Sequence, residues 1–453
     1  MFKKILIANR GEIALRVIRA CREMDIRTVA VHSDVDRESL HVAMADETFC
    51  VGPGPATQSY LNIPNIISAA LVAGAEAVHP GYGFLAENSD FVEICHSHGL
   101  VFIGPSVEAM RLMGDKAMAR QTVTGVGVPV LPGTEEVQDI KDALAFASEH
   151  GYPIMLKAAA GGGGRGMRVV SDPSQMQRLY DTARSEAEAA FGDGRIYLEK
   201  FLPNARHIEF QVLGDSHGNV IHLGERDCSV QRRNQKLIEE SPSVALTPER
   251  RREMGDAAVR AARACSYTGA GTVEFLYEDR AGFYFLEMNT RIQVEHPVTE
   301  MVTGIDLVKE QIRIAAGERL QLGQDEVVLK GHAIECRINA EDPNQGFAPS
   351  LGRLTEVHLP GGPGVRIDTH LYSGAVVQPF YDSLLAKVIA HGANREEALA
   401  RMNRVLAELR VTGVKTTVDF HRRILQNEFF RQGQIHTTFV EKELAQVLAE
   451  VSG

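Results

Sequence analysis

Short apolar runs alternate with amphipathic helical stretches over the first part of the chain. Residues 4–8 form an apolar run that leads into Asn9, Arg10 and Gly11, and residues 13, 17, 21 and 24 then carry apolar side chains at helical spacing. Strands are also expected at residues 28–32 and 77–79, with helical stretches between them. Because strands that alternate with helices are typical of parallel, doubly wound sheets, we expect such a sheet here.

One turn in this part of the chain resembles a dinucleotide-binding fingerprint. Residues 79–86, HPGYGFLA, contain G-x-G-x-x-A directly after an expected strand. Short glycine patterns are common, and Pro80 and Tyr82 stiffen this loop. A tight connection between a strand and a helix is therefore the better interpretation.

A run of glycines lies between two expected strands in the middle of the chain. The strands are residues 152–157 and 167–170, and the segment between them reads AAAGGGGRG. Glycines expose backbone N–H groups without side-chain obstruction, so the loop can fold over phosphate oxygens as a mobile flap. Lys157 and Arg165 bracket it with positive charge, which a simple linker does not need. No G-x-x-x-x-G-K-[ST] occurs, which excludes a P-loop NTPase, and a flexible hairpin tip without a ligand stays open.

Two more strands and a basic run follow. The strands are expected at residues 196–200 and 207–213, and residues 226–236, RDCSVQRRNQK, then gather four cations. Such a run is often a solvated face, but it can also be a local anion site. Gln231, Asn234 and Gln235 would add neutral hydrogen-bonding groups suited to an oxyanion.

The most informative pattern is a β-hairpin of residues 272–278 and 283–288 around a turn at 279–282. If Glu278 pairs with Phe283, Glu274 lies opposite Glu287, and Asn289 points to the same face. Two carboxylates at about 4 Å repel by roughly 4 kcal/mol at an effective dielectric of 20, so a positive charge should lie between them. Carboxylate and amide oxygens suit Mg²⁺, which usually accompanies a nucleoside triphosphate. A slipped register with both glutamates in water is the alternative.

The segment after this hairpin and the C-terminal part complete the pattern. Arg291, Gln293 and Glu295 place a cation, an amide and a carboxylate within five residues. Residues 331–342 are expected to extend the second sheet, and residues 346–364, rich in glycine and proline, predict a loop-dense β region. Residues 395–410 predict an amphipathic helix that packs on the sheet. Its apolar face is Ala398, Met402, Val405 and Leu409.

Composition narrows the class of protein. At 453 residues, two or three domains are expected, and a formal net charge of −11 argues against a nucleic-acid or acidic-membrane binder. The six cysteines are scattered and form no CxxC pair, as expected in a reducing cytosol. Neither a signal peptide nor a membrane-spanning run is found, so we expect a cytoplasmic enzyme.

Together these segments resemble biotin carboxylase, a member of the ATP-grasp group. The motifs are IANRGEIALR (7–16), HPGYGFLAEN (79–88), MGDKAMAR (113–120), KAAAGGGGRGM (157–167), ERDCSVQRRNQK (225–236), EMNTRIQVEHPVTE (287–300) and GHAIECRINAEDP (331–343). The resemblance implies a mixed α/β and α+β fold with three domains. These are a Rossmann-like parallel-sheet domain (1–114), an ATP-grasp domain with a mobile glycine-rich lid (115–330, lid about 131–203), and a C-terminal mainly β domain with helices (331–446).

The resemblance also implies which residues bind what. ATP would be bound by Lys116, Lys157, Gly161, Gly162, Gly163, Gly164, Arg165, Gly166, Glu199, Lys200, Leu202, His207, Gln231 and Asn234. Mg²⁺ (or Mn²⁺) would be held by Glu274, Glu287 and Asn289. Bicarbonate and biotin would meet Lys236, Arg291, Gln293, Val294, Glu295 and Arg337, of which Lys236, Arg291 and Glu295 would be catalytic.

The implied reaction transfers a carboxyl group to biotin through carboxyphosphate. No Met-Lys dipeptide, the usual biotin attachment site of the family, occurs in the chain, so biotin is expected on a separate carrier protein beside carboxyltransferase subunits. A homodimer is implied, with Arg19 and Glu23 near the contact. Acetyl-CoA carboxylase is the favoured parent complex, and pyruvate, propionyl-CoA or 2-oxoglutarate carboxylase is the alternative. Position 234 is Asn where members serving bacterial acetyl-CoA carboxylase often have His, which leaves the complex open.

Two other functions share part of this pattern. Another ATP-grasp ligase, joining a carboxylate to an amine, would share the glycine loop and metal set but would lack RIQVEHP and ECRINAEDP. A nucleotide-binding regulatory protein without catalysis would have lost Glu295, Arg291 or a metal carboxylate, and all of them are present.

Overall fold

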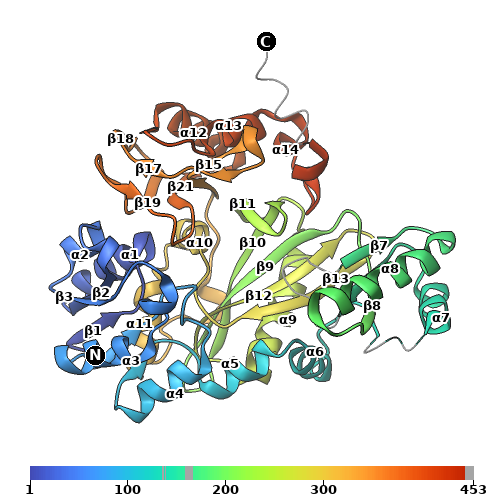
Figure 1. The fold of residues 1–453 in the computed structure, drawn as a ribbon, viewed down its shortest axis with the longest axis horizontal. Coiled ribbons are helices and arrows are strands. Elements are labelled where there is room, and N and C mark those ends of the chain that lie inside the picture. The colour runs from blue at the N-terminus through green and yellow to red at the C-terminus, as the bar shows by residue number, and fades with distance from the viewer. Residues whose placement is uncertain (135–136, 138, 159–166, 444–453) are drawn as a thin grey trace.

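A computed structural model describes residues 1–134, 137, 139–158 and 167–443 (Figure 1). The first part of the chain lies at the left of the view and the C-terminal part lies above it. The strands and helices between them extend to the right. Among the described helices, none is long and apolar enough to cross a lipid bilayer.

The first part contains the expected parallel sheet. In spatial order, its strands are β3 (Glu47–Gly52), β2 (Arg27–Ser33), β1 (Lys4–Ile7), β4 (Ala77–His79) and β5 (Val101–Phe102). The three central strands were predicted. The two edge strands were not, because β5 has only two residues and β3 has a single buried position, Val51, among partly or fully exposed ones. The helices of this part are α1 (Gly11–Glu23), α2 (Leu40–Met44), α3 (Ile63–Ala73), α4 (Ser89–Ser97) and α5 (Val107–Gly114).

An eight-stranded sheet crosses the rest of the molecule. In spatial order, its strands are β13 (Gly282–Asn289), β12 (Gly269–Glu278), β9 (Arg206–Gly214), β10 (Val220–Arg232), β11 (Gln235–Ser241), β14 (His332–Asn339), β21 (Leu384–Gly392) and β19 (Val365–Thr369). All neighbours are antiparallel. Strand β14 pairs with β11, which confirms the predicted extension of this sheet for His332–Asn339, whereas residues 341 and 342 belong to a separate two-stranded sheet. The sheet thus joins the middle and C-terminal parts. Helices α6 (Lys116–Gly125), α9 (Pro248–Ala264), α10 (His296–Thr303) and α11 (Leu307–Ala315) lie along it.

A separate three-stranded sheet forms the right-hand lobe of Figure 1. Its order is β7 (Met167–Val170), β6 (Ile154–Ala158) and β8 (Ile196–Lys200), and helices α7 (Ile140–His150) and α8 (Pro173–Phe191) pack on it through one apolar core. The strands on both sides of the glycine run are therefore confirmed. The run itself, with Gly161 to Gly166, lies outside the described residues.

The C-terminal part packs helices on the end of the large sheet. Helix α12 (Arg395–Glu408) contacts β21, and its predicted apolar face is buried. The loop-dense β region at 346–364 is confirmed by the short strands β16 (Ala348–Pro349), β17 (Gly352–Arg353) and β18 (Glu356–His358). Their partners outside this region are β15 (Glu341–Asp342), β20 (Val376–Val377) and β22 (Arg410–Thr412). Helices α13 (Val418–Gln426) and α14 (Glu428–Arg431) follow.

Candidate active site

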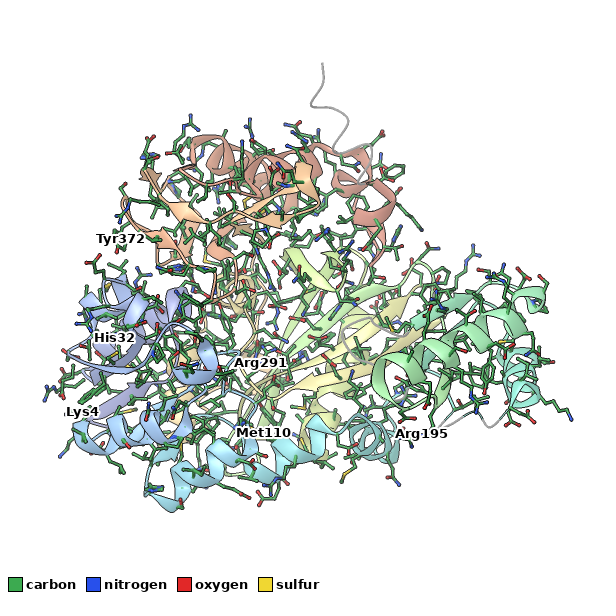
Figure 2. All side chains as sticks on the ribbon, in the orientation of Figure 1. Lys4, His32, Met110, Arg195, Arg291 and Tyr372 are labelled. Carbon is green, nitrogen blue, oxygen red and sulfur yellow. The ribbon has the colours of Figure 1, made fainter. Side chains whose placement is uncertain are left out.

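One cavity of about 1060 Å³ lies where the three parts meet, and Arg291 marks it near the centre of Figure 2. Every predicted site residue in the described part of the chain lines it. These residues are Lys116, Lys157, Glu199, Lys200, Leu202, His207, Gln231, Asn234, Lys236, Glu274, Glu287, Asn289, Arg291, Gln293, Val294, Glu295 and Arg337. The fold therefore brings together positions that are up to 221 residues apart in sequence.

The register of the β12–β13 hairpin differs from the prediction at the tip and agrees with it at the site. Glu278 pairs with Gly282 and not with Phe283, so the predicted tip pairing is wrong. A bulge at Leu286 inserts one extra residue into β13 and shifts the register by one position. Beyond the bulge Glu274 does lie opposite Glu287. The two carboxylates face each other because the bulge compensates for the shorter turn.

These two carboxylates have the properties of a cation site. Burial and the neighbouring charge of Glu274 raise the pKa of Glu287. The positive charges near Glu287 therefore do not compensate for the negative charge of the pair. Among the described residues, Glu287 forms an ion pair with the Lys116 ammonium, which is 3.9 Å away and largely exposed. Asn289 donates its amide to Glu274 at 2.9 Å, which leaves its carbonyl oxygen toward Arg291 at 3.3 Å. Hard oxygen donors with excess negative charge fit Mg²⁺ or Mn²⁺.

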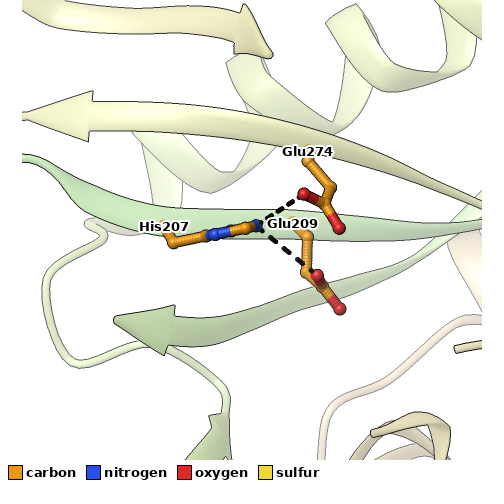
Figure 3. Close-up of side chains that lie close together, drawn as sticks. All are labelled: His207, Glu209 and Glu274. Atoms are coloured by element: carbon orange, nitrogen blue, oxygen red, sulfur yellow. Dashed lines mark ion pairs between the residues drawn. The ribbon is translucent and has the colours of Figure 1, made fainter. Parts of the chain in front are cut away.

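Lys236 neutralises the other side of this cluster. Its ammonium lies 2.5 Å from Glu209, 3.0 Å from Glu274 and 2.6 Å from Glu295. His207 adds an ion pair to Glu274 at 2.8 Å and lies 3.8 Å from Glu209 (Figure 3). Burial disfavours the charged form of Glu274, but Lys236 and His207 outweigh it and hold the pKa of that carboxyl below its usual range. Lys236 therefore bridges Glu209 and Glu274 within the His207–Glu209–Glu274 group.

Glu295 is held between two cations. Besides Lys236, it accepts a hydrogen bond from Arg337 at 2.9 Å, and Arg337 also donates to Glu239 at 2.6 Å. Burial opposes ionisation of Glu295, but Lys236 and Arg337 more than compensate and place its pKa well below the usual range. The carboxylate is therefore ionised at neutral pH.

Arg291 reaches the same space from the loop that follows β13. Its guanidinium donates to Glu87 at 2.8 Å and to the side chain of Gln293 at 2.9 Å. Gln293 in turn donates to Glu274 at 3.1 Å. These bonds orient one cation and one amide toward the cavity.

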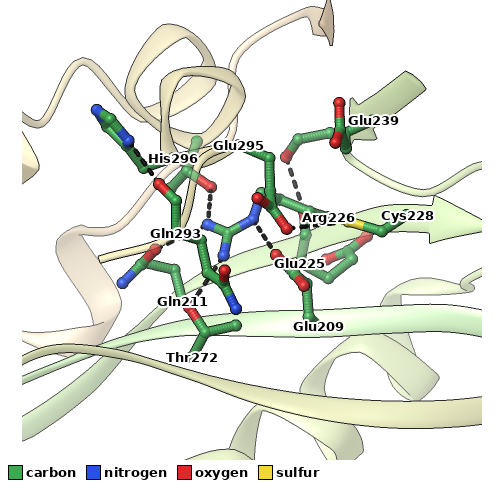
Figure 4. Close-up of polar contacts among 12 residues, drawn as sticks. Glu209, Gln211, Glu225, Arg226, Cys228, Glu239, Thr272, Gln293, Glu295 and His296 are labelled. Carbon is green, nitrogen blue, oxygen red and sulfur yellow. Dashed lines mark hydrogen bonds and ion pairs between the residues drawn. The ribbon is translucent and has the colours of Figure 1, made fainter. Parts of the chain in front are cut away.

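A buried arginine supports the floor of the site (Figure 4). Arg226 on β10 is fully buried and donates to Glu209 at 2.5 Å. Its other nitrogens donate to Gln211, Thr299 and Thr272 at 2.7 to 3.0 Å. Glu209 is thereby fixed between Arg226 and Lys236.

The basic run at 226–236 thus resolves into several roles. Arg226 is buried in the floor, Lys236 faces the carboxylates, and Arg232 lies over the ring of Phe347 at 4.2 Å. Arg233 is exposed at a turn where both it and Asn234 have positive φ. Arg233 is therefore part of a solvated face, whereas Lys236 faces the cavity, where the anion site stays a prediction.

At the other end of the cavity, cations surround Glu199. Lys157 on β6 forms an ion pair with Glu199 on β8, and Arg120 on α6 donates to the same carboxylate at 3.1 Å. Asp115 caps α6 by accepting hydrogen bonds from the N–H groups of Ala117 and Met118. The exposed Lys116 follows this cap.

Sequence reasoning missed several partners of the predicted residues. Glu209 could have been found, because it lies two residues after His207 on the same face of a strand. No such pattern identified Glu87, Arg120 or Glu239, because their partners lie 204, 79 and 98 residues away in sequence.

The comparisons with known proteins agree with this geometry. Residues 1–110 match the biotin carboxylase N-terminal domain, residues 115–323 match the ATP binding domain of the carbamoyl-phosphate synthase L chain, and residues 335–442 match the biotin carboxylase C-terminal domain. The chain belongs to the biotin carboxylase family. It is therefore an ATP-dependent ligase, and the resemblance seen in the sequence is confirmed.

Individual relatives cover nearly the whole chain. The biotin carboxylase of Nostoc sp. is 60% identical over 442 residues, which are 97% of this chain and 99% of that protein. A pyruvate carboxylase subunit of Methanothermobacter thermautotrophicus is 53% identical over all of this chain and 92% of its own. The biotin carboxylase domain dimer of Hydrogenobacter thermophilus 2-oxoglutarate carboxylase, solved with MgADP, ADP and bicarbonate, has a TM-score of 0.91. It is 50% identical and covers 99% of both chains. This biotin carboxylase structure confirms the mixed α/β fold class.

Proposed function

We propose that this protein uses ATP and bicarbonate to carboxylate biotin on a separate carrier protein, and releases ADP and phosphate. The observation that carries the proposal is the convergence of Lys236 and Arg337 on Glu295 beside the Glu274–Glu287 pair. One cavity therefore offers an anion site next to a cation site. Phosphoryl transfer to an anionic nucleophile needs both.

Glu295 is the proposed base. A bicarbonate that accepts hydrogen bonds from Lys236 and Arg337 competes with Glu295 for both cations. Glu295 then regains basicity at the moment when it must take the proton of bicarbonate. The deprotonated oxygen attacks the γ-phosphate of ATP, and carboxyphosphate and ADP form.

Glu274, Glu287 and Asn289 would hold Mg²⁺ (or Mn²⁺). When bound, the metal ion supplies charge neutralisation for the phosphate oxygens. Lys236 adds positive charge from the opposite side. Lys116 and Lys157 would bind phosphates, which requires Lys157 to exchange Glu199 for the nucleotide. Gly161 to Gly166 would close over these phosphates and exclude water.

The remaining nucleotide contacts belong to the same proposal. Residues 199–202 and His207 would line the adenine and ribose site, with Gln231 and Asn234 beside them. The domain boundaries at 114, 330 and 446 stay predictions. The family-model matches run over similar ranges.

Carboxyphosphate then transfers its carboxyl group to biotin. Its breakdown gives CO₂ and phosphate, and the leaving phosphate takes the proton of the biotin ureido nitrogen, which attacks CO₂. Arg291 would stabilise the enolate-like ureido oxygen, and Arg337 would hold the anionic carboxyphosphate.

We place the protein in a cytoplasmic acetyl-CoA carboxylase that serves fatty-acid synthesis, beside a biotin carboxyl carrier protein and carboxyltransferase subunits. The higher identity to the Nostoc protein, which is named biotin carboxylase alone, than to the pyruvate carboxylase relative supports a parent complex other than pyruvate carboxylase. Asn234 keeps the alternative open, which is a pyruvate, propionyl-CoA or 2-oxoglutarate carboxylase. We also propose a homodimer with the exposed Arg19 and Glu23 of α1 near the contact, as supported by the dimeric 2-oxoglutarate carboxylase domain.

The test is ADP release from ATP with Mg²⁺ and free biotin, with and without bicarbonate. ADP formation should require both bicarbonate and biotin and should collapse in Glu295→Gln. ADP release that is indifferent to bicarbonate would contradict the proposal. Reconstitution with purified carrier and carboxyltransferase, offering each acyl-CoA or oxoacid in turn, identifies the parent complex.

A further inference from the structure

A buried lysine lies behind the Arg291–Glu295 segment. Lys387 is in the middle of β21 and its side chain has no solvent exposure. Its ammonium donates to the backbone carbonyl of Val294 at 2.9 Å. A fully buried ammonium is costly unless it is paired, so this lysine needs compensation.

The compensation comes from the first part of the chain. Glu12, in the first turn of α1, is buried and lies 3.0 Å from the Lys387 ammonium. The hydroxyl of Tyr82 donates to Glu12, and its ring lies 5.8 Å from the ammonium. Asp368 on β19 is 4.0 Å away and is itself paired with Arg366 at 2.7 Å. The ammonium therefore links the first and C-terminal parts to the loop that carries Val294.

The position of the Val294 carbonyl matters because of its neighbours. Gln293 and Glu295 precede and follow it, and both are tied to the carboxylate and cation clusters of the site. Fixing this carbonyl fixes the peptide that leads into Glu295. Arg337 and Lys387 are also direct partners across β14 and β21. Adjacent strands thus present two cations, one to the Glu295 carboxylate and one to the backbone just before it.

We propose that Lys387 is a positioning residue for the bicarbonate end of the site, and that Glu12 holds it in place. This inference deepens the proposed function and rests on it. Lys387 acts through the backbone of Val294 and touches no reacting atom. Its loss should therefore affect bicarbonate more than ATP.

The first variant is Lys387→Met, which keeps the length of the side chain and removes the donor. We expect the KM for bicarbonate to rise roughly tenfold, with a lower kcat and a KM for ATP within about twofold of the unchanged protein. Arg395→Met is the matched control. Arg395 forms a largely buried ion pair with Glu240 at 2.7 Å in the same region and contacts no residue of 291–295 in the described structure. It should lower the unfolding midpoint and leave the KM for bicarbonate unchanged.

The double variant Glu12→Gln, Lys387→Met distinguishes a positioning role of Lys387 from a role in charge balance alone. It also replaces the single variant in the measurement if Lys387→Met fails to fold. It removes both buried charges, so stability should recover. The donor to Val294 is still absent, so the raised KM for bicarbonate should persist.

Recovery of both the stability and the KM for bicarbonate in the double variant would overturn the proposal and assign Lys387 to charge balance alone. An unchanged KM in both variants, with the unsubstituted protein still requiring bicarbonate, would overturn the positioning role and leave the proposed function intact. An unsubstituted protein that ignores bicarbonate would overturn the proposed function itself.

Discussion

Glu239 and Glu335 face each other across β11 and β14, and both side chains are fully buried. Glu239 accepts a hydrogen bond from Arg337 through one oxygen. Its other oxygen and both oxygens of Glu335 have no hydrogen-bond partner in the described part of the chain. Two opposed buried carboxylates with one donor between them indicate that the pair keeps a proton.

The first prediction concerns this proton. Burial, reinforced by the charges of Glu239 and Glu295, raises the pKa of Glu335 well above its usual value, although Lys387 and Arg337 oppose the shift. A raised carboxyl pKa contributes stability that is complete below the unfolded pKa of about 4.3 and is lost as pH rises toward the folded pKa. Glu335→Gln, which mimics the protonated form, should therefore gain stability relative to the unsubstituted protein as pH rises from 5 to 8. Chemical denaturation at several pH values measures this difference. A difference that does not change with pH would show that Glu335 is ionised in the folded protein.

The second prediction concerns the carboxylate pair of the hairpin. Glu287→Gln removes the repulsion with Glu274 that contributes to the raised pKa of Glu287. Without metal, the variant should be more stable by less than about 1 kcal/mol, because the Glu287 side chain is 40% exposed and water screens the charge. With ATP, it should need about ten times more Mg²⁺ for half-maximal activity. Glu278→Gln, at the tip of the same hairpin, is the control and should change neither quantity.

The hairpin also shows how far the sequence predicts this site. Its two carboxylates were predicted to face each other because side chains alternate along strands. The pairing of Glu274 with Glu287 beyond the bulge confirms this prediction. The bulge at Leu286 was not predictable, since no residue type there demands one. Lys387 stands alone in an apolar strand, which indicates a buried partner. The sequence could not identify that partner as Glu12, because only the packing of the first part against β21 brings them together. Patterns along one element therefore predicted the carboxylate pair, whereas contacts between distant parts, such as Lys387 with Glu12, were missed.

The third prediction concerns Lys236, which touches three carboxylates. Lys236→Met leaves Glu209, Glu274 and Glu295 without their shared cation and should cost about 3–5 kcal/mol of stability. His207, Glu209 and Glu274 could then hold a divalent ion, so Mn²⁺ should raise the thermal midpoint of the variant more than that of the unsubstituted protein. Lys236→Arg keeps the charge and is the control. An equal response of all three proteins to Mn²⁺ would contradict this account of Lys236.

The fourth prediction concerns Arg226, which is fully buried and supports Glu209 beneath the cavity. Arg226→Lys keeps the charge, but an ammonium cannot reach Glu209, Gln211, Thr272 and Thr299 together, so stability should fall by about 2–4 kcal/mol. Arg226→Met should cost more, because Glu209 then loses one of its two cations. Urea denaturation measures both, and Arg252→Lys on the exposed face of α9 should stay within about 0.5 kcal/mol of the unsubstituted protein. A variant at 226 that folds with full stability yet loses ATP turnover would assign Arg226 to the reaction and not to the floor beneath it.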